Sequence, residues 1–78
     1  MRAISLIALQ GRLSRAVIRT LSRIPEVSTI HSTNGAWVLV VEIRTDSLVS
    51  FDRVLRDIRE VPGVTNSESC LLLSHVSG

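Results

Sequence analysis

Residues 35–44 read GAWVLVVEIR, and this stretch decides the fold. It is rich in β-branched residues and follows the turn formers Thr33 and Asn34, so it is predicted to be the second strand of a β-hairpin. Alternate side chains of a strand face opposite ways. One face takes Trp37, Leu39, Val41 and Ile43, and the other takes Ala36, Val38, Val40, Glu42 and Arg44. The first face is wholly apolar and the second is apolar over its first half. Both faces therefore need cover, and in so short a chain we expect a second copy to supply it.

The bulk composition predicts one small domain that spans residues 1–78. With 78 residues the core is small, and Cys70 is the only cysteine, so no disulfide stabilises the chain. We expect Cys70 to be a small buried hydrophobic residue in a reducing compartment, and we expect oligomerisation to supply the missing stability. The net charge of +2 is weak evidence for nucleic-acid binding. No signal peptide or membrane-spanning run is apparent, so a cytoplasmic location is expected.

Hydrophobic periodicity predicts the remaining elements. Strands are expected over residues 3–10, 27–32 and 64–76, and helices over residues 12–24 and 48–61, each helix being followed by a proline. The predicted apolar stripes are Leu13, Val17, Leu21 and Ile24 in the first helix, and Leu48, Phe51, Leu55 and Ile58 in the second. Asp46-Ser47 supplies N-cap chemistry for the second helix.

The two halves of the chain resemble each other at a shift of 37 residues. Ile24-Pro25-Glu26-Val27-Ser28 aligns with Val61-Pro62-Gly63-Val64-Thr65. The order is thus βαβ twice, which predicts an α+β, ferredoxin-like βαββαβ sandwich. Right-handed crossovers place both helices on one face of a four-stranded antiparallel sheet. The other face is left bare, and we expect two chains to close there into a dimeric α/β barrel.

Few constellations in the sequence suggest catalysis, and none has the spacing of a metal site. His31 and His75 are isolated from other potential metal ligands, and there is no glycine-rich phosphate loop, so neither metal nor cofactor is expected. The arginine stripe of the first helix could bind phosphate, although a solvated face is the favoured interpretation, because no stacking aromatics accompany it. The stripe consists of Arg12, Arg15, Arg19 and Arg23.

Hydroxyl and amide groups suggest a small-molecule site. Thr65, Ser67 and Ser69 alternate along the last strand, and together with the turn residues Thr33, Asn34 and Gly35 they could hold a small zwitterion. Ordinary strand polarity is the alternative interpretation of these residues. Trp37 is either a core residue or the wall of a pocket at a subunit junction.

Three stretches resemble the effector-binding (RAM) domain of Lrp/AsnC transcription regulators. They are Thr33-Asn34-Gly35-Ala36-Trp37-Val38, the helix Ser50-Phe51-Asp52-Arg53-Val54-Leu55, and Val61-Pro62-Gly63-Val64 with the following Ser67-x-Ser69 and Leu71-Leu72-Leu73. The resemblance covers nearly the whole chain. It implies sheet-mediated homodimers, higher rings such as octamers or decamers, and amino-acid binding in clefts between dimers.

Carried onto this chain, the resemblance implies effector-binding roles for a defined set of residues. These are Thr33, Asn34, Gly35, Trp37, Ser67 and Ser69. Val38 stands where the family usually has an aspartate, which removes a carboxylate suited to an ammonium group. The family's DNA-reading helix-turn-helix normally precedes this domain, so a stand-alone form without direct DNA or membrane binding is expected, with a full-length regulator as a possible partner. The alternatives are a ligand-free assembly module, and a cofactor-free barrel enzyme of the monooxygenase or isomerase type.

Overall fold

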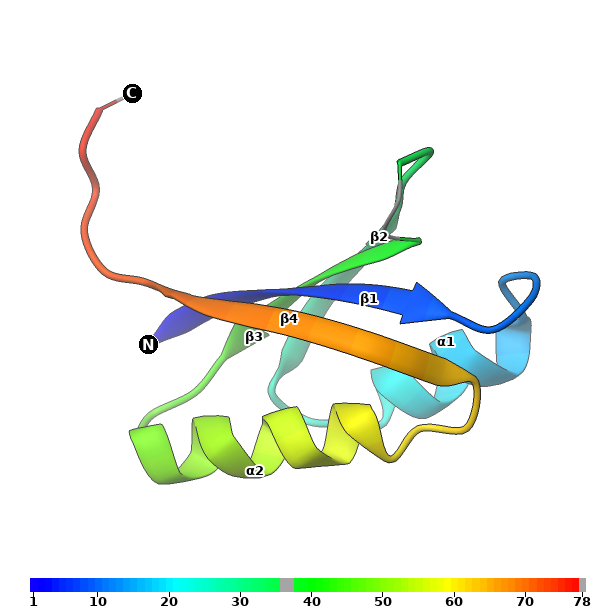
Figure 1. The fold of residues 1–78 in the computed structure, drawn as a ribbon. Coiled ribbons are helices and arrows are strands. Elements are labelled where there is room, and N and C mark those ends of the chain that lie inside the picture. Colours follow the sequence, from blue (N-terminus) through cyan, green and yellow to red (C-terminus); the bar gives the residue numbers. More distant parts are fainter. Residues whose placement is uncertain (36–37, 78) are drawn as a thin grey trace.

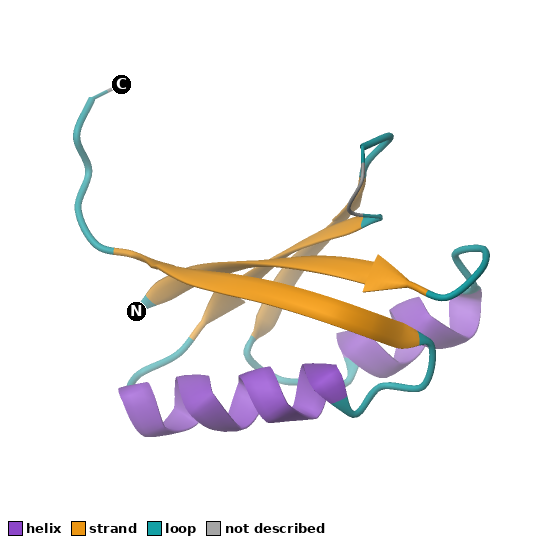
Figure 2. Ribbon diagram, viewed as in Figure 1, coloured by secondary structure: helices purple, strands orange, loops and turns teal. Residues whose placement is uncertain are grey.

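The computed structural model describes residues 1–35 and 38–77. Its elements in chain order are β1 (Arg2–Leu9), α1 (Arg15–Ser22), β2 (Val27–Ser32), β3 (Leu39–Arg44), α2 (Leu48–Arg59) and β4 (Val64–Leu72). The strands form one antiparallel sheet in the order β2-β3-β1-β4. Both helices lie on the same face of this sheet (Figure 1). Figure 2 shows the resulting two layers, one of helices and one of strands. The predicted ferredoxin-like βαββαβ arrangement is confirmed.

The hydrophobic core lies between the sheet and the helices. The predicted inward face of β3 is confirmed, because Leu39, Val41 and Ile43 are at most 1% exposed. The other core residues are Ala3, Ile7, Val17, Leu21, Val54, Ile58 and Val61. Complete burial of a Val, Leu or Ile side chain contributes about 1.5–3 kcal/mol, so this cluster is what holds the two layers together.

The internal repeat is visible in the backbone hydrogen bonds. After α1 the Val27 N–H donates to the Ile24 carbonyl, and after α2 the Val64 N–H donates to the Val61 carbonyl, both at 3.1 Å. A hollow of about 270 Å³ lies between the two helix ends. It is lined by Thr20, Arg23, Ile24 and Pro25 and by their repeat partners Asp57, Glu60, Val61 and Pro62. The sequence shift of 37 residues therefore corresponds to a structural two-fold similarity between the halves.

Helix α1 begins three residues later than predicted. Gly11 has a φ of +73°, which a helix does not contain, and the Ser14 side chain caps α1 by accepting a hydrogen bond from the Val17 N–H at 3.3 Å. The predicted N-cap of α2 at Asp46-Ser47 is confirmed, with the Ser47 side chain accepting from the Ser50 N–H at 3.1 Å. Both helices end two residues before the predicted positions, with Arg23 and Glu60 as C-caps.

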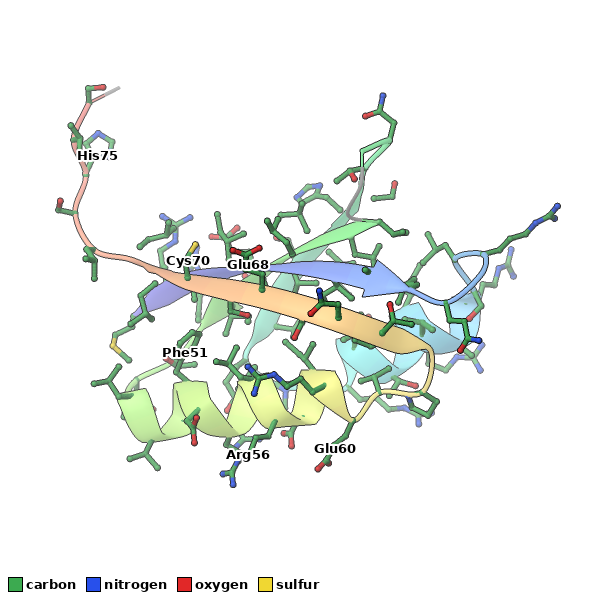
Figure 3. All side chains as sticks on the ribbon, viewed as in Figure 1. Phe51, Arg56, Glu60, Glu68, Cys70 and His75 are labelled. Carbon is green, nitrogen blue, oxygen red and sulfur yellow. The ribbon has the colours of Figure 1, made fainter. Side chains whose placement is uncertain are left out.

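The predicted apolar stripe of α2 is partly wrong. Val54 is fully buried, while Leu48 in the first turn is 62% exposed. Phe51 packs against the core from between α2 and the sheet (Figure 3), and Ile58 is buried as predicted. Leu13 lies outside α1 and is also exposed. Of the four residues predicted for the stripe of α2, Ile58 is buried, Phe51 and Leu55 are half-buried, and Leu48 is exposed.

The last strand is shorter than predicted. β4 ends at Leu72, which pairs with Arg2, the first residue of β1. Residues 73–77 have no strand beside them to continue the ladder, and they rise away from the helix layer (Figure 1). The ladder on β1 thus sets the end of β4, although the apolar sequence continues to Val76.

Candidate functional site

Two of the predicted effector-binding residues lie on the helix-facing side of β4. Ser67 pairs with Ile7 and Ser69 pairs with Ser5, and both of these β1 residues are fully buried. Paired residues of neighbouring strands point to the same face of a sheet. Ser67 and Ser69 are half-buried for this reason, beside the core and next to α2.

The hydroxyl of Ser69 is used inside the protein. Its Oγ donates to Ser5 Oγ at 2.8 Å, and Ser5 is one of the few buried polar residues. A buried hydroxyl without a partner would cost about 1–3 kcal/mol. Ser69 therefore satisfies Ser5 in the single chain, in addition to its predicted role toward an effector.

Ser67 opens onto a hollow at the junction of α2 and β4. The hollow has a volume of about 280 Å³, and its lining residues are Arg59, Val64, Thr65, Asn66 and Ser67. The Thr65 hydroxyl donates to the Ala8 carbonyl at 3.3 Å, close to the point where the β1–β4 register shifts. Arg59 and Asn66 were not predicted from the sequence. The short connection between α2 and β4 was the available signal, because it brings the last turn of α2 beside the start of the strand.

The predicted turn residues lie at the tip of the β2–β3 hairpin. The Thr33 N–H donates to the Val38 carbonyl at 2.9 Å, and the Gly35 N–H donates to Thr33 Oγ1 at 3.3 Å. Thr33, Asn34 and Gly35 are exposed, and the Val38 N–H ties the hairpin to β1 by donating to the Ile7 carbonyl at 3.0 Å. Trp37 lies outside the described residues, as does the first part of the predicted strand.

The two predicted groups do not meet within one chain. Ser32, Leu39, Ile7 and Ser67 form one row across the sheet, so β3 and β1 stand between the hairpin and Ser67. Neighbouring strands are about 4.8 Å apart, which separates the ends of this row by roughly 14 Å. The hairpin also rises on the side of the sheet away from the helices (Figure 1), whereas Ser67 and Ser69 face the helices. A single site that contains both groups needs more than one copy of the chain.

The face of the sheet opposite the helices has an apolar centre and polar ends. Ile4, Leu6 and Val40 are half-buried on it, and Cys70 is exposed on it. Figure 3 shows Cys70 and Glu68 on the side of β4 away from the helices. The expectation that Cys70 is buried is therefore wrong for the single chain, because its position in the β4 alternation places it on the bare face.

An ion pair lies at one end of this bare face. Glu42 Oε1 accepts a hydrogen bond from Arg2 Nε at 3.0 Å and contacts Arg2 Nη2, and Glu42 Oε2 accepts from the Thr29 hydroxyl at 3.3 Å. The hydrogen bond from Arg2 is the main cause that lowers the pKa of the Glu42 carboxyl below its ordinary value. Glu42 is therefore a stable carboxylate at neutral pH.

Among residues 1–35 and 38–77, no group of three or more histidine, cysteine or acidic residues is placed to hold a metal ion. Neither α1 nor α2 has the length and hydropathy that a membrane-crossing helix requires.

Residues 2–77 match the model of one protein family, the Lrp/AsnC ligand binding domain. This chain belongs to that family. It is 26% identical over 57 residues to the HTH-type transcriptional regulator LysM of Saccharolobus solfataricus, a match that covers 73% of this chain and 40% of LysM. The chain thus spans less than half of that curated relative.

Solved structures of other proteins have the same fold. The structure of TTHA0845 from Thermus thermophilus matches with a TM-score of 0.86 and 24% identity, covering 99% of this chain and 98% of the other. The complex of the Neisseria meningitidis regulator NMB0573 with L-methionine also matches with a TM-score of 0.86, at 14% identity, covering 99% of this chain and 52% of the regulator. LysM and NMB0573 are transcriptional regulators by name, and the NMB0573 structure contains L-methionine.

Proposed function

We propose that this Lrp/AsnC domain binds a small effector, an amino acid, and forms oligomers that act in transcription regulation, without being an enzyme. The hollow beside Ser67 carries the binding part of the proposal, because it gathers polar groups on the strand that holds the predicted serines. The L-methionine complex of the Neisseria meningitidis regulator supports an amino acid as the class of effector.

The oligomer is proposed to form through the bare face of the sheet. Helices cover one face only, while the other presents Ile4, Leu6 and Val40 at its centre. Two such faces packed together would remove these side chains from water, which is favourable by about 25 cal/mol per Å² of apolar surface. The separation of the hairpin residues from Ser67 supports higher assemblies, since neighbouring copies could bring the two groups together. Rings of dimers are the expected form.

The proposed route to transcription is indirect. Each described helix packs one side onto the sheet, with Val17 and Leu21 of α1 and Val54 and Ile58 of α2 buried there. Among the described elements, α1 and α2 are separated in the chain by β2 and β3, so they do not form the helix-turn-helix pair that reads the major groove. The domain is therefore proposed to act on DNA only through a regulator with which it assembles, and to work in the cytoplasm.

A thermal-shift screen against the twenty amino acids, with oligomer mass recorded in parallel, tests the proposal. An effector at about 100 times its dissociation constant stabilises the folded state by about 2.7 kcal/mol. We expect a clear rise in melting temperature with at least one amino acid, and a smaller rise in the Ser67→Ala variant. Ser74→Ala, in the exposed tail after β4, is the control and should respond like the unmodified chain. A large oligomer with no response to any amino acid would instead indicate an assembly module without an effector.

A further inference from the structure

The hollow at the α2–β4 junction contains a single charged group. Arg59 lines it, and no carboxylate does. The neighbouring arginines of α2 are paired, since Arg53 contacts Glu26 and Asp57 and Arg56 contacts Asp52. Arg59 makes no ion pair within the described residues. The charge in the hollow is therefore positive and available.

The polar groups around Arg59 are mainly hydrogen-bond donors. The Ser67 hydroxyl faces the helix layer beside the hollow and makes no hydrogen bond to another part of the described chain, whereas the side chain of Asn66, the next lining residue, alternates to the opposite face of the sheet. The Thr65 hydroxyl already donates a hydrogen bond to the Ala8 carbonyl. A guanidinium carries five N–H donors and a hydroxyl carries one, so the hollow presents donors that need acceptor oxygens.

Arg59 also determines the sign of the local potential. It is the last residue of α2, and the C-terminal end of a helix carries about half a negative charge. Without the guanidinium, the hollow would lie beside this negative end and repel an anion. An arginine offers a planar fork that matches the two oxygens of a carboxylate.

We propose that this hollow binds the carboxylate of a small organic acid through Arg59 and Ser67, and that the site does not require an ammonium group. The proposal rests on the proposed effector function and narrows the chemistry that the site recognises. Val64 provides an apolar wall, and a volume of about 280 Å³ fits a molecule the size of an amino acid or its 2-oxo acid. An ammonium group has no acidic partner among the lining residues, so the 2-oxo acid binds as well as the amino acid.

The test measures binding of defined probes to the full chain by calorimetry. The probes are the twenty amino acids, the amide of each amino acid that binds, the 2-oxo acids of methionine, leucine and alanine, and inorganic phosphate. We expect at least one 2-oxo acid to bind, and we expect amides, which lack the carboxylate, to bind at least tenfold more weakly than the acids. Amides that bind as well as the acids would overturn the proposal, as would phosphate binding more tightly than every carboxylate.

The matched variants are Arg59→Gln and Arg56→Gln. Both residues are exposed on α2, but Arg56 points away from the sheet toward solvent (Figure 3) and does not line the hollow. Arg59→Gln should weaken binding of the acids by about tenfold or more, because a hydrogen-bonded charge is lost, and Arg56→Gln should leave it unchanged. Equal affinity in Arg59→Gln would remove Arg59 from the site while leaving the effector function intact. If no amino acid binds but a 2-oxo acid does, the amino-acid function fails and the carboxylate site stands. If no acid binds at all, both fail.

Discussion

At the scale of single residues, Glu42 links the charge state of the bare sheet face to the stability of the fold. Its carboxylate accepts hydrogen bonds from Arg2 and Thr29, and the first of these is the main cause of its lowered pKa. The folded state therefore binds this proton less readily than the unfolded state. The stabilising contribution is complete above the ordinary carboxyl pKa of about 4.3 and is lost as the pH falls through the lower pKa of the folded state.

The corresponding prediction concerns acid unfolding. Glu42→Gln should flatten the fall in stability below about pH 4.3, because the substituted side chain cannot take up a proton. Urea unfolding at a series of pH values, at one protein concentration, measures this effect. Glu68→Gln is the control, since Glu68 lies on the same face without an ion pair among the described residues. An unchanged pH profile in Glu42→Gln would mean that the Arg2–Glu42 contact does not form in solution.

The sequence predicted the chemistry of single residues better than their surroundings. Alternation along β4 correctly placed Ser67 and Ser69 on one face, but not the hydrogen bond from Ser69 to Ser5, which depends on how β4 registers against β1. Arg59 was missed although the short connection from α2 to β4 brings the last turn of the helix beside the start of the strand. Cys70 was expected to be buried because a lone cysteine in a chain rich in strand formers is most simply a small hydrophobic residue, yet the bare face of the sheet exposes it.

At the scale of elements, the turns around the helices are set by two glycines with positive φ. Gly63, between α2 and β4, has a φ of +99°, and a Cβ added there would lie 3.3 Å from Val17 Cγ2. Its carbonyl also accepts a hydrogen bond from the Gln10 N–H at 2.8 Å, so the turn is fixed to the end of β1. Gly11 has a φ of +73° but has open space where a Cβ would be.

Because their surroundings differ, Gly11 and Gly63 are predicted to lose different amounts of folding free energy when each is replaced by alanine. The Gly11→Ala substitution should lower the free energy of unfolding by about 1–2 kcal/mol, which is the cost of a left-handed backbone for a residue with a side chain. Gly63→Ala should lose roughly 2–4 kcal/mol, because crowding against Val17 adds to that backbone cost. Urea midpoints of the two variants, compared with the unmodified chain, measure the difference. Equal losses would show that Val17 moves aside freely.

Hydrophobic periodicity predicted which segments are helices and which are strands. It did not predict where each one ends, because the ends depend on contacts with other parts of the chain. The 37-residue repeat and the alternation of β3 were sufficient to predict the βαββαβ order. The start of α1 depends on the Ser14 cap, and the end of β4 depends on where β1 begins. Leu48 was wrongly included in the buried stripe of α2 and Val54 was left out of it, because the spacing of apolar residues does not decide which of Val54 and Leu55 turns toward the core.

At the scale of the whole molecule, the helices cover only one face of the sheet, and this feature connects the fold to the proposed function. Helices close one side of the sheet, and the hairpin and the C-terminal residues both rise on the other side (Figure 1). These projections border the apolar centre of the bare face. A second chain packed there would cover Leu6, which pairs with Val40 on one side and Glu68 on the other.

The pairing of Leu6 with Glu68 makes a discriminating variant possible. In Leu6→Lys the new ammonium group has a carboxylate beside it on the neighbouring strand, so the single chain should still fold. Between two packed sheets the same charge would be removed from water at a cost of several kcal/mol. We therefore expect light scattering to show oligomers for the unmodified chain and the 8.6 kDa monomer for Leu6→Lys. Val49→Lys, at an 81% exposed position on α2, should leave the mass of the oligomer unchanged.

The reactivity of the Cys70 thiol gives a second test of whether the bare face of the sheet is covered, and it does not depend on the mass measured by light scattering. It is the only cysteine, and it lies beside Ile4 on the bare face. A thiol reagent should modify it at least tenfold faster in Leu6→Lys than in the unmodified chain, because sheet packing excludes the reagent. If Cys70 of the unmodified chain reacts as fast as a free thiol while light scattering still shows an oligomer, the chains associate through another surface. In that case the apolar centre of the sheet would remain open to solvent, and the contact between copies would have to be sought on the helix layer.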